Sequence, residues 1–199
     1  MREAANIAAV AALQPDYMGF IFYPASPRYI APVSAELIRY IPAGLKTTGV
    51  FVNETPGLVL EKQHTHQLDA LQLHGHETPA YCAALKESGA EIIKAFGIAP
   101  GFDFNSLEAY LPVVDYFLFD TQSPAHGGSG KAFDWQVLAQ YPWPKAYFLS
   151  GGIGPEHVEA LKNLNDERLY ALDLNSRFEQ APGLKDSHKL ADFFKKIRD

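Results

Sequence analysis

The stretches YFLFDT (residues 116–121) and AYFLSGGIGP (residues 146–155) decide the fold of this chain. Each is an apolar, strand-like run that ends in polar or glycine residues and leads into a helix-like segment. Successive parallel strands place their carboxyl ends at one edge of a sheet. Glycine lets backbone N–H groups approach a ligand closely, and the next helix adds its positive end. The two stretches therefore predict a phosphate-binding edge with one carboxylate, Asp120, beside it.

Strand-like and helix-like segments alternate along the whole chain. An Ala-rich helix is expected over 3–13, and helix signals such as Thr55-Pro56 and Thr78-Pro79 follow the strand-like runs. A helix is also expected from Ser34. The strand-like runs are seven, at residues 17–22, 48–52, 70–73, 91–96, 116–120, 146–150 and 169–174. This alternation predicts an α/β domain with a parallel sheet.

The closed form of such a sheet is the (β/α)8 TIM barrel, whose active site lies at the carboxyl ends of its strands. The rival is an open, doubly wound sheet. A second glycine turn after the next-to-last strand favours the barrel, where phosphate sites commonly follow the last two strands. We therefore predict one barrel domain over residues 1–199, with its first strand missing from this chain, before Met1, so that seven strands remain.

Composition limits the possible functions. A net charge of -6 argues against nucleic acid as the main partner, because binding its phosphates needs a basic patch. No apolar run is long enough to span a bilayer, and no signal-peptide pattern opens the chain. A single cysteine excludes an internal disulfide framework. These features predict a cytoplasmic protein without a membrane or nucleic-acid partner.

Several residues at strand ends are candidates for binding and catalysis. Asp120 can act as a general acid, although a capping or loop-ordering role is the alternative. Arg28 carries the planar fork that suits a carboxylate, although a plain surface arginine is its alternative. The phosphate candidates are the glycine turn after residue 149 and the end of the last strand. They comprise Gly151, Gly152, Asn175 and Ser176, while Asp173 is a candidate for fixing the loop after the last strand.

The sequence gives only weak support for metal binding by the histidines or for nucleophilic catalysis by the cysteine. His64, His66, His74 and His76 are close in sequence, but two of them are expected at each end of the sheet. We therefore predict no metal site. Cys82 lies inside a predicted helix, where packing is a better interpretation than nucleophilic catalysis.

Seven motifs, in one order along nearly the whole chain, resemble the phosphoribosylanthranilate isomerase family of tryptophan biosynthesis. They are DYMGFIF (16–22), SPRY (26–29), GVFVN (49–53), QLHG (72–75), FDT (119–121), the loop from Gly127 to Trp135, and LSGGI (149–153). The resemblance implies a (β/α)8 barrel. It also implies an isomerase that catalyses an Amadori rearrangement of a phosphoribosyl aminal without metal or organic cofactor.

The resemblance assigns roles to several residues. Asp120 matches the general acid that protonates the ribose ring oxygen, and Arg28 matches the arginine that holds the anthranilate carboxylate. Arg177 departs from the family pattern, where a glycine is usual. The remaining matches are Gly128 and Gly130 in a closing loop, Gly151 and Gly152 in a phosphate turn, and Asn175 and Ser176 in the last phosphate loop. The implied partner is a small phosphorylated sugar–anthranilate substrate, and the implied state is a monomer or homodimer.

The main departure from the family is at the start. The family opens with a strand ending in Cys-Gly, whose cysteine is the general base at the sugar C2, and Met1 matches the residues just after that motif. Cys82 matches an outer helix and cannot replace the base. We therefore expect impaired catalysis, with a non-catalytic phosphosugar-binding barrel as the alternative. The barrel synthase that closes the indole ring is disfavoured, because Lys94 is the only strand lysine near a suitable position.

Overall fold

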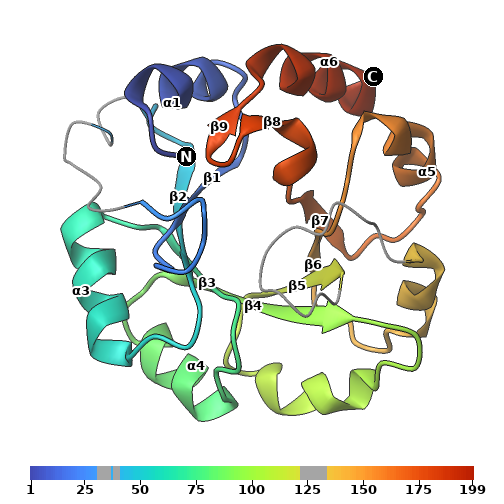
Figure 1. The fold of residues 1–199 in the computed structure, drawn as a ribbon. Helices are drawn as coiled ribbons and strands as arrows, with labels where there is room; N and C mark the ends of the chain where they lie inside the picture. The colour runs from blue at the N-terminus through green and yellow to red at the C-terminus, as the bar shows by residue number, and fades with distance from the viewer. Residues whose placement is uncertain (31–36, 38–40, 122–133) are drawn as a thin grey trace.

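The computed structural model describes residues 1–30, 37, 41–121 and 134–199. Seven strands form one parallel sheet in the order of the chain (Figure 1). They are β1 (Tyr17–Ile21), β2 (Lys46–Phe51), β3 (Ala70–Leu73), β4 (Glu91–Ile98), β5 (Tyr116–Thr121), β6 (Tyr147–Leu149) and β7 (Leu169–Leu172). A doubly wound sheet would reverse its strand order at a switch point, and this sheet does not. The predicted barrel-type fold is confirmed, and the alternative of a doubly wound sheet is wrong.

Helices surround the curled sheet on its outer side (Figure 1). The α-helices are α1 (Ala4–Ala11), α3 (Pro56–His66), α4 (Pro79–Lys86), α5 (Val158–Lys162) and α6 (Ser187–Arg198). The 3-10 helices are η1 (Phe104–Tyr110), η2 (Trp135–Gln140), η3 (Pro155–His157) and η4 (Ser176–Phe178). The helix predicted from Ser34 falls mainly outside the described residues.

Local sequence explains where α3 and α4 begin. The Thr55 side chain accepts a hydrogen bond from the Leu58 N–H, and the Thr78 side chain accepts one from the Tyr81 N–H. In each helix a proline follows the capping threonine, where its missing N–H has no intrahelical partner to lose. Both predicted helix starts are confirmed.

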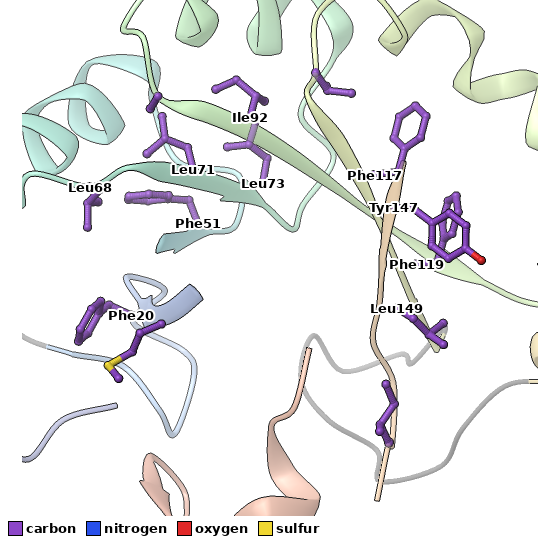
Figure 2. Packing of buried hydrophobic residues seen from close by; sticks show 14 of the residues in the cluster. Phe20, Phe51, Leu68, Leu71, Leu73, Ile92, Phe117, Phe119, Tyr147 and Leu149 are labelled. Carbon is purple, nitrogen blue, oxygen red and sulfur yellow. The ribbon is translucent and has the colours of Figure 1, made fainter. Parts of the chain in front are cut away.

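The apolar core has two layers that follow the alternation of side chains along the strands. The larger layer lies between the sheet and the helices, and it includes Phe117, Phe119 and Leu149 (Figure 2). Helix residues such as Leu85 belong to the same cluster. The smaller layer lies inside the barrel. Its buried members are Ala70, Ile93, Ala95, Leu118 and Phe148. The sheet is therefore apolar on both faces, as barrel strands are.

The sheet does not close within the described residues. The strand order ends at β1 on one side and β7 on the other, and these two strands do not pair with each other. A cavity of about 430 Å³ runs between them and is lined by Gly19 and Ile21 of β1 and by Ala171 and Leu172 of β7. Strand β1 therefore borders a gap in the sheet.

The short segments η1, η2 and η3 are 3-10 turns, and η3 continues into the short α5. Such short segments can form only a few α-helical bonds, so tighter turns compete. A hairpin that was not predicted from the sequence follows β7 and is formed by β8 (Glu179–Ala181) and β9 (Leu184–Lys185).

Candidate active site

The cavity extends from the gap to the carboxyl ends of the strands, where most predicted site residues meet. The predicted site residues that line it are Arg28, Asp120, Gly151, Gly152, Asp173, Asn175 and Ser176. Gly128 and Gly130 lie outside the described residues. The structure thus brings together residues from the loop after β1 and from the ends of β5, β6 and β7.

Asp120, at the carboxyl end of β5, is the centre of a short chain of side chains. Its Oδ1 accepts the Thr121 N–H at 2.7 Å, and its Oδ2 lies 3.2 Å from Nε2 of His74. The other ring nitrogen of His74, Nδ1, lies 3.1 Å from Nε2 of Gln72. With the Gln72 amide donating to Nδ1, the imidazole carries its proton on Nε2 and donates it to Asp120. The contact of His74 with Asp120 was not predicted from the sequence.

Gly151 is a glycine because Asp120 and its neighbour lie too close for a side chain. Its φ is +91°, and a Cβ built there would lie 2.3 Å from Oγ1 of Thr121 and 2.8 Å from Oδ1 of Asp120. Gly152 also has a positive φ, of 65°. The glycine turn after β6 is therefore packed against the carboxylate at the end of β5, as well as being a candidate phosphate turn.

Asp173 is a second carboxylate, half-buried and just after β7. Its N–H donates to the Leu149 carbonyl at 2.8 Å, and the Ser150 Oγ donates to its Oδ2 at 3.3 Å. Burial raises the pKa of Asp173, and the nearby charge of Asp120 raises it further. The two carboxyl groups therefore interact, which is typical of a site that handles protons.

Arg28 is held by a local turn and by a distant carboxylate. The Arg28 N–H donates to Oγ of Ser26, and the Tyr29 N–H donates to the Ser26 carbonyl. The Arg28 guanidinium donates to Glu179 of β8 through Nε at 2.8 Å and lies 2.7 Å away through Nη2. Sequence analysis predicted a ligand carboxylate for Arg28 and did not foresee this internal one.

The end of the last strand is also tied down by charged side chains. Asn175 Oδ1 accepts a hydrogen bond from Nζ of Lys185 at 2.7 Å. Arg177 pairs with Glu156 at the start of η3. Arg177 thereby links the loop after β7 to the helical turn after β6, and both of these segments flank the predicted phosphate turn.

Lys94 and Cys82 lie away from the chemistry, in buried structural positions. The Nζ of Lys94 donates to three backbone carbonyls and lies 3.1 Å from Glu77. Lys94 therefore stabilises the end of β3, the loop after β3 and the neighbouring part of β4. Burial raises the pKa of Cys82 to about 11, which makes its thiol a poor nucleophile. The role of Lys94 weighs against the indole-ring synthase hypothesis.

Two further properties concern the described residues as a whole. They contain no group of three or more histidine, cysteine, aspartate or glutamate side chains placed to hold a metal ion. None of the helices among them has the length and apolar character needed to cross a membrane.

The fold and the site define a βα-barrel enzyme, with a carboxylate at the end of β5 facing a glycine turn after β6. The family model for N-(5'-phosphoribosyl)anthranilate (PRA) isomerase matches residues 1–196. The chain belongs to this isomerase family, which acts in tryptophan biosynthesis.

Individual relatives agree with this family. An N-(5'-phosphoribosyl)anthranilate isomerase of Parabacteroides distasonis is 46% identical, over 99% of this chain and 90% of the relative. The crystal structure of the Thermotoga maritima isomerase has a TM-score of 0.88 and 34% identity, over 100% of this chain and 95% of that one. A second isomerase structure, bound to reduced 1-(o-carboxyphenylamino)-1-deoxyribulose 5-phosphate, has a TM-score of 0.83 and 31% identity, over 98% of this chain and 94% of that one.

Proposed function

We propose that this chain isomerises N-(5-phosphoribosyl)anthranilate to 1-(2-carboxyphenylamino)-1-deoxyribulose 5-phosphate. The observation that carries the proposal is the packing of the Asp120 carboxylate against the Gly151 turn, in the cavity that Arg28 also lines. The substrate has three features to be recognised: a phosphate, a ribose ring oxygen and an aromatic carboxylate. Each has a matching group in this cavity.

The phosphate is assigned to the turn of Gly151 and Gly152 and to the loop of Asn175 and Ser176. Backbone N–H groups in such turns hold phosphate without a charged side chain. The anthranilate carboxylate is assigned to Arg28, whose guanidinium can hold it with paired hydrogen bonds. These contacts would orient the sugar with its ring oxygen toward the end of β5.

Two proton transfers make up the reaction. In the first, Asp120 donates a proton to the ring oxygen, the C1–O bond breaks, and the nitrogen lone pair forms a C=N bond. His74 positions Asp120 through its contact with Oδ2. In the second, a base removes the proton from C2, the electrons of the C–H bond form a C1=C2 double bond, and the electrons of the C=N bond return to nitrogen. The resulting enol becomes the ketone as its O–H proton is lost and C1 gains a proton.

The base of the second step is proposed to lie in the gap between β1 and β7, on a segment that fills this gap. In the resembled family a strand ending in Cys-Gly supplies it, and such a strand would run beside Gly19 and Leu172 at the open edges of the sheet. Backbone pairing would satisfy both edges. The proposal therefore expects full activity only when an extended segment with a base fills this gap.

A comparison of three proteins tests the proposal. The first is the 199-residue chain. The second, called the Cys-Gly form, is the same chain with a strand-length segment ending in Cys-Gly added before Met1. The third is the Cys-Gly form with Ala in place of that Cys. Steady-state turnover of the Cys-Gly form should exceed that of the other two by about 10²–10⁴-fold. Equal turnover of the 199-residue chain and the Cys-Gly form would contradict the base assignment and leave His74 as the candidate base. Binding of the reduced product by all three proteins without turnover would instead indicate a binding protein.

The remaining aspects of the proposal concern partners and location. The ligand is a small phosphosugar–anthranilate, and no nucleic-acid or membrane partner is invoked, in line with the acidic charge of the chain. A monomer or homodimer is proposed because a structural neighbour from Thermotoga maritima is described as a dimeric isomerase. The cytoplasm is proposed as the location, because one cysteine excludes an internal disulfide framework.

A further inference from the structure

We propose that Glu179 is a positioning residue that fixes the Arg28 guanidinium and so makes the site selective for a ligand with a carboxylate. The proposal rests on the proposed function, in which Arg28 binds the anthranilate carboxylate. It adds a residue 151 positions away along the chain, in a hairpin that has no role in that scheme.

Glu179 is itself fixed by its own hairpin. Its Oε1 accepts the Gly183 N–H at 3.1 Å and lies 3.2 Å from Nζ of Lys185. The hairpin is in turn tied to α1, because the Asn6 side chain accepts the Lys185 N–H at 2.8 Å and donates to the Lys185 carbonyl at 2.7 Å. The carboxylate of Glu179 is therefore a rigid reference point, and its side chain is only 4% exposed.

The charge state of Glu179 agrees with this role. Burial alone would raise its pKa, but hydrogen bonds from Arg28 and the charge of Lys185 hold the pKa below its ordinary value. Glu179 therefore stays ionised at neutral pH. The single carboxylate of Glu179 thus contacts two cationic side chains, Arg28 and Lys185.

The geometry of the guanidinium allows both roles at once. Arginine has five N–H donors arranged along two edges of a plane. Glu179 contacts the edge formed by Nε and Nη2 of Arg28. The edge formed by the two terminal nitrogens is the one that a second carboxylate can use. The Arg28 side chain is 12% exposed and lines the cavity, so the pairing holds a long, flexible side chain at the site before a ligand arrives.

A competing role for Glu179, in which it occupies the ligand's place, does not fit its surroundings. To leave Arg28, Glu179 would have to break its bonds to Gly183 and Lys185 or remain a buried carboxylate without the guanidinium. Removing one partner from a buried pair is costly. Positioning requires no such movement.

The test is calorimetry on Glu179→Gln with two ligands. One is reduced 1-(2-carboxyphenylamino)-1-deoxyribulose 5-phosphate, and the other is the same compound without its carboxyl group. Glu179→Gln should bind the carboxylated ligand about tenfold more weakly, because misplacing a binding group by a fraction of an ångström is enough for such a loss. Its affinity for the second ligand should not change. Glu179→Asp keeps the charge but shortens the reach, and it should lie between Glu179→Gln and the unchanged chain.

The matched control is Asp166→Asn. Asp166 forms a similar paired contact with Arg168, at 2.7 and 2.8 Å, just before β7 and at the opposite end of the barrel from the site. This variant should lose stability without changing the ratio of the two affinities. Circular dichroism and thermal unfolding check that every variant is folded.

Several results would overturn the proposal. If Glu179→Gln lowered the affinity for both ligands equally, Glu179 would have a general structural role. Tighter binding of the carboxylated ligand would mean that Glu179 competes with it, and unchanged binding would mean that Arg28 needs no support. The proposed function fails differently: the unchanged chain would then bind neither ligand, or Arg28→Ala would weaken both equally.

Discussion

Replacing Gly151 by Ala tests the packing that holds the candidate acid in place. The φ of +91° costs an L-residue about 1–2 kcal/mol. The new Cβ would lie 2.5 Å from the Thr121 backbone nitrogen, about 0.9 Å short of ordinary contact, and 2.8 Å from Oδ1 of Asp120. Overpacking of this kind adds about 1–3 kcal/mol. We expect a total loss of about 2–5 kcal/mol in the free energy of unfolding, measured with urea.

The same substitution should also impair catalysis, because the end of β5 must move. A displacement of about 1 Å costs about 10²-fold in rate, measured as turnover of the Cys-Gly form. Gly44→Ala is the control, since Gly44 has a φ of +93° and no atom lies within 4 Å of the place that its new Cβ would take. Gly44→Ala should lose only the stability that a positive φ costs an L-residue, and its turnover should not change. Equal loss of stability in the two variants, with normal turnover in Gly151→Ala, would refute the reasoning.

Three further predictions concern single charged groups. Arg28→Ala should weaken binding of the reduced product by about 1.5–3 kcal/mol in calorimetry, and an unchanged affinity would remove Arg28 from the site. Lys94→Met should cost about 3–5 kcal/mol in urea unfolding, because it leaves Glu77 buried without its cation; a loss below about 1 kcal/mol would contradict this. Hydrogen bonds from Arg168 lower the pKa of Asp166 to about 2 from 3.8, so its contribution of about 2 kcal/mol is present above pH 3.8 and is lost as pH falls toward 2. Asp166→Asn should remove this part of the pH dependence of unfolding, and an unchanged slope between about pH 4 and pH 2 would refute the assignment.

The strands and their order could be predicted from sequence because each is a short apolar run between polar turns. Ala70–Leu73 was predicted with the bounds that the structure has, and Tyr17, Glu91, Tyr116 and Leu169 were predicted as strand starts. Buried barrel strands give this continuous apolar signal. The hairpin was missed because β8 and β9 have only three and two residues, too few for a periodic pattern.

The site was predictable in its members but not in its pairings. Asp120 and Arg28 could be selected because Asp120 lies at the end of one strand and Arg28 in the loop after another, and parallel strands end at one edge. The contacts of Arg28 with Glu179 and of His74 with Asp120 join segments 151 and 46 positions apart, and no local pattern encodes which groups meet across a barrel. The glycine at position 151 was predicted as a phosphate turn, while its close approach to Asp120 needed the structure.

The most direct test of the account is Asp120→Asn in the Cys-Gly form, followed by both turnover and binding. Asparagine keeps the size of the side chain and its bond from the Thr121 N–H, but it cannot donate the acid proton. The account predicts a fall in kcat of about 10²–10⁴-fold, with the affinity for the reduced product nearly unchanged. A kcat equal to that of the Cys-Gly form would contradict the assignment of Asp120 as the general acid.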